Sequence, residues 1–591
     1  MQERTVNNTV TTTHLAASEN SLEIALGGHE QVPRDWMPAS QVRSFIFDDP
    51  AVVWLQFHGD EYGFQPDTSP YDFLDFIAAK SRQFEQKWIA EMAPGAVQVC
   101  RAAQDVRSAV KVRETFEWMQ QRAPVIAQPA LWWAPERIYG VPDLLVHTSW
   151  IGENFPHLWA EEGSQGAAPH PSNNDHLGHY VVFDLKFTTK LDQRSKAKDL
   201  ENYAAQARIY TYMLGQFQGR MPNRAYLVAR DRVDDPLPVA IPSALDQPLD
   251  EDLAAMRDQF VEIKVNGAKY VPWQDEIVAP NLARRDDRWR TAKETIARDK
   301  VPGSDATLLY QIGAAAKREL SGRGYSNLAS MLQVDPGQVP LEEARGIGEK
   351  KAARIRAVLQ ANRSGAPVLP PGNLVPPSKP FEFYVDLEFF TSLNVDLKTE
   401  WPALDGCEMV FMIGVGCEDQ GDWRFKAFVA EHESQDQELA IFESFLDYLK
   451  AETNGALLDG SKVALYHWTS TEPRRTERAA ENHQLAPDHP LRKLPWLDLQ
   501  KVFLNAPAAV PGAWGFGLKP VARAVGTLDS TFLTEWPGEL DVGSHAMVMG
   551  WEAYQTAHPA ESAEMQTVKQ YLEADCKALW QILRWLRASA R

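Results

Sequence analysis

The chain has few cysteines for its length, and they lie far apart. Four occur in 591 residues, and no two form a Cys-x-x-Cys pair. They are Cys100, Cys407, Cys417 and Cys576. This spacing argues against a zinc site and against an iron–sulfur cluster. A disulfide-stabilised secreted domain is also excluded, so we expect a protein of a reducing compartment, most simply cytoplasmic.

Long apolar runs and a nucleotide-binding loop are missing as well. No stretch reaches the ~18 apolar residues of a membrane span, and the N-terminus lacks a basic-then-apolar signal pattern. We therefore expect no membrane partner. No Gly-x-x-x-x-Gly-Lys-Ser/Thr segment occurs, so we expect no ATP site of its own.

The chain also lacks an excess of positive charge. Its 60 basic and 80 acidic residues give a formal net charge of −20, which argues against a general nucleic-acid coat. Two segments reverse this balance. Residues 186–198 carry five Lys/Arg against one acid, and residues 343–363 carry six against two. Because binding depends on local charge, nucleic acid stays a candidate partner.

Composition predicts a soluble α/β protein of about three domains. Residues 1–37 are rich in Thr, Asn, Ser and Glu without a sustained period, and we expect a disordered tail there. Prolines recur from 366 to 380, which predicts a stiff linker over 365–379. The remaining ranges, 38–275, 276–364 and 380–591, are the predicted folded parts.

The apolar run from Tyr180 to Phe187 is interrupted by Asp184 and Lys186. Side chains alternate across a strand, so these two charges must share one face. Asp143 follows Gly-Val-Pro before another apolar stretch and can supply a second carboxylate. Two carboxylates suit Mg²⁺ or Mn²⁺, an ion that polarises a phosphodiester and activates water, and the lysine can stabilise developing charge. The alternative is a plain strand ion pair.

Gln206 and Tyr210 are four residues apart in a pattern of helical period, so we expect them on one helix face. In this order, Pro-Asp143, Asp184-x-Lys186 and Gln206-x-x-x-Tyr210 resemble the RecB-like PD-(D/E)XK nucleases. The resemblance covers residues 38–275. It implies a restriction-endonuclease-like domain and the catalytic residues Asp143, Asp184, Lys186, Gln206 and Tyr210, with Asp143 and Asp184 as metal ligands.

Glu85 stands where the family's first acidic motif falls, on a helix expected from Tyr71 to Met92, and we include it as a catalytic candidate. Ser81 replaces the family's usual glycine, and an ordinary solvated glutamate is the alternative. A loop inserted between Asp143 and Asp184 contains four histidines. They are His157, His170, His176 and His179. Their irregular spacing favours a polar loop over a metal clip.

Residues 276–364 are expected to be helical. Gly346 and Gly348 permit a tight turn whose amides, at the start of the next helix, can face a phosphate. This segment resembles a helix-hairpin-helix element, and the predicted DNA-binding residues are Gly346, Gly348, Lys350, Lys351 and Arg354. A helix junction without a ligand is the alternative.

Residues 380–591 contain the same pattern as Asp184 and Lys186, because Asp386 and Glu388 are two residues apart on a hydrophobic strand and share one face. Strands are expected over 409–415, 423–429 and 463–468, and helices over 437–450 and 565–585. On the last helix, Tyr571 and Asp575 share one face.

With Glu472, these residues resemble the DEDD exonucleases of the RNase H-like fold. The resemblance implies the catalytic set Asp386, Glu388, Glu472, Tyr571 and Asp575, with Asp386, Glu388 and Asp575 as metal ligands. Glutamate replaces the second aspartate, and His467 stands where the family often has asparagine. Asp498 is a further nearby acid. Asp386 and Glu388 could also be remnants in a binding domain.

The order nuclease, helical element and RNase H-like domain resembles predicted RecB-like nucleases, some of which are joined to a helicase. It implies a metal-dependent DNA nuclease acting on single strands or ends in repair or defence, with any helicase on a separate chain. The first alternative is a non-catalytic scaffold of a helicase or defence complex. The second is an RNA-processing exonuclease that works through the C-terminal domain.

Overall fold

The computed structural model describes residues 20–69, 71–158, 178–245, 247–284, 288–536 and 543–589. The chain divides into two compact units. The first comprises residues 1–66 and 77–293, and the second residues 67–76 and 294–591. Within the described ranges, no helix combines the length and apolar character needed to cross a bilayer.

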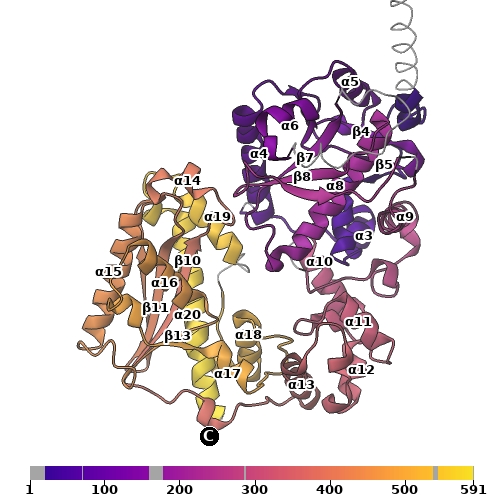
Figure 1. Cartoon of the computed structure of the whole chain (residues 1–591). Coiled ribbons are helices and arrows are strands. Elements are labelled where there is room, and N and C mark those ends of the chain that lie inside the picture. The colour runs from indigo at the N-terminus through magenta and orange to yellow at the C-terminus, as the bar shows by residue number, and fades with distance from the viewer. Residues whose placement is uncertain are drawn as a thin grey trace, which may run out of the picture. The chain divides into compact units, whose positions relative to one another are not determined.

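The first unit is built on a six-stranded mixed sheet and a small three-stranded sheet (Figure 1). The large sheet has the order β2-β3-β6-β7-β8-β9 and the small one the order β1-β5-β4. Its strands are β1 (Met37–Pro38), β2 (Val97–Gln98), β3 (Val125–Ala127), β4 (Leu131–Trp133), β5 (Ile138–Gly140), β6 (Leu144–His147), β7 (Tyr180–Lys186), β8 (Arg224–Ala229) and β9 (Leu237–Ala240). Its helices are α2 (Val42–Ile46), α3 (Ala51–His58), most of α4 (Phe73–Met92), α5 (Ala109–Gln120), α6 (Thr148–Asn154), α8 (Ala197–Gln218), α9 (Glu251–Asn266) and the start of α10 (Arg290–Thr295).

Alternation along β7 decides which side chains enter the core. Val181, Phe183 and Leu185 pack with Trp88 of α4 and Phe155, just after α6. Because neighbouring strand residues point to opposite faces, Asp184 and Lys186 project to the other face, against which α8 packs. Strand β7 is antiparallel to β6 and parallel to β8. The fold therefore brings the end of β7 and one face of α8 together.

The second unit contains a five-stranded mixed sheet of order β12-β11-β10-β13-β14. Its strands are β10 (Phe381–Phe390), β11 (Met409–Asp419), β12 (Asp422–Val429), β13 (Val463–His467) and β14 (Trp496–Asp498). Its helices are α11 (Ala314–Ser321), α12 (Leu328–Gln333), α13 (Glu349–Ser364), α14 (Leu397–Glu400), α15 (Gln435–Glu452), α16 (Thr471–Asn482), α17 (Leu499–Asn505), α18 (Leu518–Leu528), α19 (Gly543–Ala553) and α20 (Ala563–Ser589).

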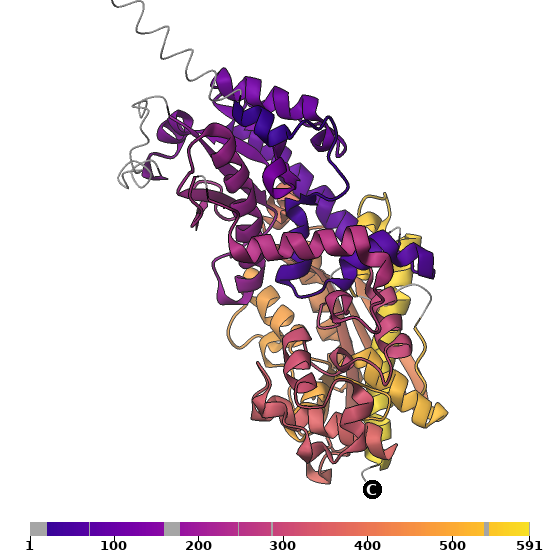
Figure 2. The same cartoon turned by 90° about the vertical axis from the view of Figure 1, so that its right-hand side faces the viewer.

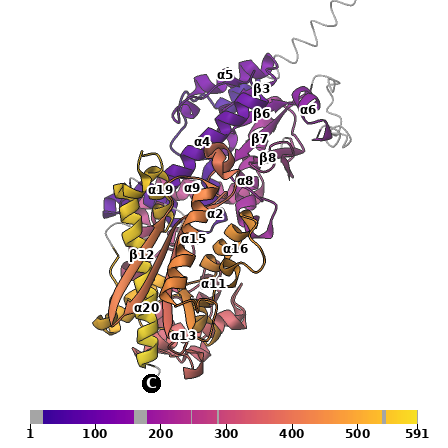
Figure 3. The ribbon, with the colours of Figure 1, turned by 90° about the vertical axis from the view of Figure 1, so that its left-hand side faces the viewer.

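Helices cover both faces of this sheet. Strand β10 is central, antiparallel to β11 and parallel to β13. Figure 3 shows α15 on one side of the strands and α20, in yellow, on the other. Helix α20 packs along β10 and β11 (Figure 2). The first unit's α8 and the second unit's α20 thus each bring a tyrosine to a strand that carries two charged residues.

Residues 20–37, which the sequence analysis assigns to a disordered tail, are folded in the structure. Residues 20–26 are helical, and Leu26, Trp36 and Met37 are buried. Three buried apolar residues are scattered among polar ones in this segment, so its composition resembles that of a disordered tail. The predicted tail therefore extends too far towards residue 37. Residues 1–19 of the predicted tail lie outside the described residues, as do His170 and His176 of the predicted polar loop.

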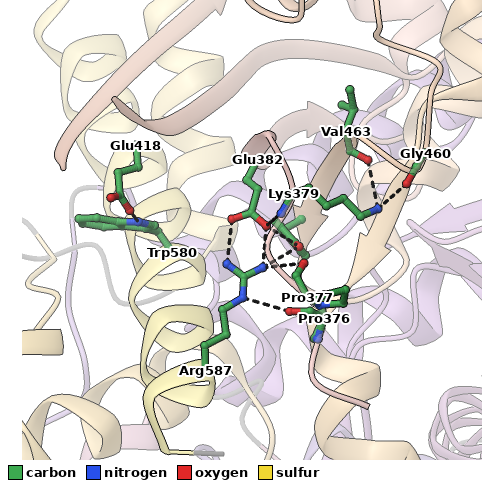
Figure 4. A network of polar contacts seen from close by, with 10 residues as sticks. Pro376, Pro377, Lys379, Glu382, Glu418, Gly460, Val463, Trp580 and Arg587 are labelled. Atoms are coloured by element: carbon green, nitrogen blue, oxygen red, sulfur yellow. Dashed lines mark hydrogen bonds and ion pairs between the residues drawn. The ribbon is translucent and has the colours of Figure 1, made fainter. Parts of the chain in front are cut away.

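The proline-rich segment is tied to the second unit along its length. Val368 pairs with Ala509 through two backbone hydrogen bonds of 2.9 Å. At the other end, Arg587 of α20 donates to the carbonyl oxygens of Pro376 and Pro377 at 3.0 and 3.1 Å and to Glu382 of β10 (Figure 4). Proline blocks regular secondary structure here, but the exposed carbonyls still accept hydrogen bonds.

Two candidate carboxylate sites and a paired turn

The first unit places Asp143, Asp184 and Lys186 together, as the sequence predicts. Asp143 precedes β6, and its Oδ2 accepts a hydrogen bond from the Leu185 amide on β7 at 2.7 Å. On β7, the Asp184 Oδ2 lies 2.5 Å from the Lys186 Nζ. The antiparallel pairing of β6 with β7 therefore brings both carboxylates to the ammonium.

Helix α8 supplies the next layer of this site. The Lys186 Nζ donates to the Gln206 Oε1 at 3.5 Å, and the Gln206 Nε2 donates to the Tyr210 hydroxyl at 2.9 Å. A Cβ at Gly140 would lie 2.5 Å from the Tyr210 ring. Glycine before Val-Pro-Asp143 is thus required by the close approach of this tyrosine.

Burial and mutual charge shift the acid–base equilibria of the site. Burial raises the pKa of Asp143 well above its ordinary value, and the negative charge of Asp184 adds to the rise. Burial alone would lower the pKa of Lys186, but the carboxylates of Asp184 and Asp143 outweigh it and raise that pKa. Lys186 therefore stays an ammonium at neutral pH and holds part of the carboxylate charge.

Glu85 of α4 is a neighbour of this group. Its Oε1 accepts a hydrogen bond from the Ser81 hydroxyl at 3.0 Å. Burial raises its pKa, and the charges of Lys186 and Asp184 act on it in opposite directions. Ser81 thus positions the carboxylate.

Sequence reasoning missed two residues of this site. Gln128 follows β3 with a left-handed backbone at φ 50°, and its Nε2 donates to the Asp143 Oδ1 at 3.2 Å. Tyr203 of α8 places its ring 5.1 Å from the Lys186 Nζ. The only sequence signal for Gln128 is a polar residue directly after an apolar strand, which is a common pattern.

The second unit gathers the other predicted acids from three elements. Asp386 and Glu388 lie on β10, Glu472 lies in the first turn of α16, and Asp575 lies on α20. Glu388, Glu472 and Asp575 are 8%, 4% and 6% exposed. A register shift between Glu388 and Phe389 interrupts the pairing of β10 with β11 at this point. Irregular pairing of this kind re-aims side chains next to sites.

The charges of these acids act on one another. Burial raises the pKa of Asp386 well above its ordinary value, and the charges of Asp575 and Glu472 raise it further. Burial likewise raises the pKa of Glu388, with a contribution from Asp386. The pKa of Glu472 rises to about 8, chiefly through burial. Such a set binds protons or cations to offset its own charge.

Neutral partners fix two of these acids. The Trp536 Nε1 donates to the Asp575 Oδ1 at 2.7 Å, and Tyr571 is also hydrogen-bonded to Asp575. His467 contacts the Glu472 Oε2 through its Nδ1 at 3.1 Å. Burial lowers the pKa of His467 to about 4, against the opposing charge of Asp498. Asp498 of β14 is the register partner of His467 of β13, so it lies near the site, as the sequence predicts.

Both carboxylate groups fit a hard divalent cation by their donor chemistry. Buried carboxylate oxygens are the ligands that Mg²⁺ and Mn²⁺ take, and in the first unit the carboxylates of Asp143 and Asp184 converge on the single buried ammonium of Lys186. As the side chains stand, no group of three or more His, Cys, Asp or Glu within the described residues is arranged to hold a metal ion.

The predicted hairpin turn has a second copy. Gly346 has φ 77°, buried Ile347 follows, and Gly348 caps α13. In the same way Gln311 has φ 54°, buried Ile312 follows, and Gly313 caps α11. One open hollow is lined by residues of both turns, namely Gln311, Gly348, Glu349, Lys350, Lys351 and Arg354.

The predicted basic residues of the turn have different partners. The Lys351 Nζ donates to the Gly346 carbonyl at 2.6 Å, and Lys350 is exposed. The Arg354 Nε donates to the Leu504 carbonyl, at the end of α17, at 3.1 Å. Arg354 therefore serves packing within the second unit, a use that its charge alone does not reveal.

Comparison with known proteins adds one identification. No curated protein and no solved structure matches the chain. A family model of the RNase_H superfamily matches residues 398–587. The match includes Glu472, Tyr571 and Asp575, while Asp386 and Glu388 precede it on β10. The C-terminal part of the second unit is thus an RNase H-like domain of a nuclease-type superfamily.

Proposed function

We propose that the protein is a divalent-metal-dependent nuclease with two catalytic centres and that DNA is its substrate. The observation that carries the proposal is the cluster Asp386, Glu388, Glu472 and Asp575. The charges of Asp575 and Glu472 raise the pKa of Asp386, and those of Asp386 and Asp575 raise the pKa of Glu388. Glu472 and Asp575 lie in the segment that matches the RNase_H superfamily. Burying mutually repelling acids is unfavourable for stability, which favours a role in chemistry.

In the C-terminal centre, Asp386, Glu388 and Asp575 would hold the ion. Mg²⁺ or Mn²⁺ bound there would supply activation of the attacking water and polarisation of the phosphodiester. Trp536 keeps the Asp575 carboxylate in place. Burial and the neighbouring acids raise the pKa of Tyr571, so this phenol stays protonated and can orient water by its hydroxyl. His467 holds Glu472 at the edge of the group.

The N-terminal centre is supported by a second arrangement. Asp143 and Asp184, with Glu85 beside them, would hold the ion. The Lys186 ammonium lies where it can offset charge that develops on the phosphate. Gln206 accepts a hydrogen bond from Lys186 and donates one to Tyr210, so α8 fixes the position of the Lys186 ammonium. This geometry supports the RecB-like PD-(D/E)XK proposal for residues 38–275.

The paired turns support a holding role for the helical region. The start of α13, Lys350 and Gln311 of the second turn border one hollow, and helix N-termini with nearby cations attract phosphate groups. We assign to this region the helix-hairpin-helix function of holding the DNA backbone without reading sequence. A role in repair or defence, on single strands or ends and with a separate helicase, completes the proposal.

The RNA alternative draws on one observation, the match of residues 398–587 to the RNase_H superfamily. That match concerns the C-terminal centre and favours neither DNA nor RNA. The substrate panel must therefore contain both nucleic acids as single and double strands.

The test compares four full-length proteins on end-labelled substrates with Mg²⁺, Mn²⁺ or EDTA. They are the parent, Asp184→Ala, Asp575→Ala and the double variant. We expect cleavage that needs metal, each single variant to lose one product pattern, and the double variant to be inert. Asp447→Ala is the matched control, because this aspartate is 77% exposed and paired with Lys450. A parent that binds these substrates without cleaving them would be a scaffold.

A further inference from the structure

Lys519 occupies an electrostatically unfavourable position. It lies in the first turn of α18, directly after the residues Gly517 and Leu518 that begin the helix. Aligned peptide dipoles give a helix N-terminus a positive partial charge, which disfavours a cation there. An ammonium in this place is therefore not explained by the stability of its own helix.

The Lys519 ammonium lies beside the C-terminal carboxylates. Its Nζ is 4.3 Å from the centroid of the Tyr571 ring and 5.7 Å from that of the Trp536 ring. Trp536 and Tyr571 are the two hydrogen-bond partners of Asp575. The positive charge of Lys519 also counteracts the rise in pKa that burial causes at Glu388 and Asp575. Lys519 thus borders the ligand group on the Asp575 side.

The balance of charge at the C-terminal centre gives the Lys519 ammonium beside Asp575 a role in substrate binding. The ion that the centre would hold offsets part of the carboxylate charge, and a bound phosphodiester would add one further negative charge. The transition state of hydrolysis adds more charge on the non-bridging oxygens, where a fixed ammonium is most effective. This step rests on the proposed function of the C-terminal centre.

We propose that Lys519 is a substrate-binding residue of the C-terminal centre and that its ammonium donates to a non-bridging oxygen of the phosphodiester next to Asp575. The rings of Tyr571 and Trp536 border the ammonium, and a cation over an aromatic face is stabilised by the ring.

The experiment uses full-length Asp184→Ala protein, so that cleavage reports on the C-terminal centre. Lys519→Ala and Lys519→Arg are compared with Lys426→Ala on a labelled single-stranded oligonucleotide, as DNA and as RNA. Lys426 lies on the edge strand β12, and its Nζ is 4.8 Å from the centroid of the Tyr448 ring. It is the matched control because it too is a lysine beside an aromatic ring. Melting temperature is measured for every variant.

We expect Lys519→Ala to lower kcat/KM by about 100-fold. The slope of log affinity against log salt should become shallower by about 0.7, the value for one lost phosphate contact on a single strand. Lys519→Arg should keep the slope, and Lys426→Ala should match the parent in both measurements.

Two results overturn the inference in distinguishable ways. If Lys519→Ala changes the melting temperature or the pH optimum but leaves the salt slope of the parent, Lys519 is a structural counter-charge. An active parent then keeps the proposed function intact. If the Asp184→Ala parent cleaves no substrate in either metal, the function proposed for the C-terminal centre fails, and this role of Lys519 fails with it.

Discussion

The two candidate centres solve the problem of buried negative charge differently. In the first unit, Lys186 lies 2.5 Å from Asp184 on the same strand, so the site contains its own counter-charge. In the second unit, four carboxylates crowd together, and Lys519 contacts the ring of Tyr571 at their edge. The first arrangement is electrostatically closer to balance without a ligand. The second depends on protons or metal ions to a greater degree.

The same secondary-structure device underlies both centres. A strand presents two charged residues at i, i+2, and a following helix presents Tyr210 or Tyr571. What differs is the second strand residue, lysine in β7 and glutamate in β10. Replacing one cation by one acid changes the charge of the site by two units, which is the charge of one divalent ion. We therefore expect the C-terminal centre to need metal more strongly, and the predictions below test this difference.

The largest effect is expected from removing the internal cation. Lys186→Ala should lower kcat for DNA cleavage by the N-terminal centre by about 100- to 1000-fold, because the developing phosphate charge loses a fixed partner. Cleavage is measured in the Asp575→Ala background. Lys198→Ala, an exposed lysine paired with Glu201 in the same basic segment, is the control. Equal activity of the two variants would reduce Asp184 and Lys186 to a strand ion pair.

The turns at Gly346 and Gln311 should affect the two centres differently, because they belong to the same unit as the C-terminal centre. They belong to the second unit, where Tyr310 hydrogen-bonds to the Trp514 carbonyl near α18. Lys350→Ala with Lys351→Ala should weaken duplex DNA binding about 10-fold and flatten the salt slope by about 1.8. Cleavage by the C-terminal centre should fall more than cleavage by the N-terminal centre. An unchanged slope would return the turns to a plain helix junction.

A smaller effect is expected at Gln128. Gln128→Gly removes the amide that holds Asp143 but suits the left-handed backbone at φ 50°. We expect N-terminal cleavage to fall about 5- to 10-fold, as for a lost hydrogen bond of ordinary strength, without a loss of melting temperature. Gln128→Asn, which keeps an amide and tolerates this backbone, should recover part of the activity. Activity that follows melting temperature across both variants would contradict a positioning role.

The features that the sequence predicts correctly depend on local periodicity. Asp184 with Lys186 and Gln206 with Tyr210 share a face because strand and helix periods alone require it. Gln128 and Trp536 reach their carboxylates over 15 and 39 residues, and no local pattern encodes such contacts. Arg354, which the sequence predicts to bind DNA, also donates from its Nε to a carbonyl 150 residues away, a contact that no local pattern encodes. Tertiary packing, rather than residue type, decides these cases.

The smallest expected effect concerns pH and stability. Burial raises the pKa of Glu472 from 4.5 to about 8 in the folded protein. Between these values the folded state keeps a proton that the unfolded state has lost, so this group's contribution to stability must decrease as pH rises from about 5 to about 8. Without metal, the melting temperature of the second unit should fall across this window, by about 2–4 °C for each kcal/mol lost.

Glu472→Gln, which imitates the protonated acid, should flatten the profile of melting temperature against pH. Mg²⁺ should stabilise the parent more at pH 8 than at pH 6, because metal competes with the proton. Calorimetry of the parent and of Glu472→Gln, with and without Mg²⁺, measures all three. A parent whose melting temperature rises with pH in the absence of metal would show that the carboxylates are offset within the protein, as in the first unit, and the contrast between the two centres would be lost.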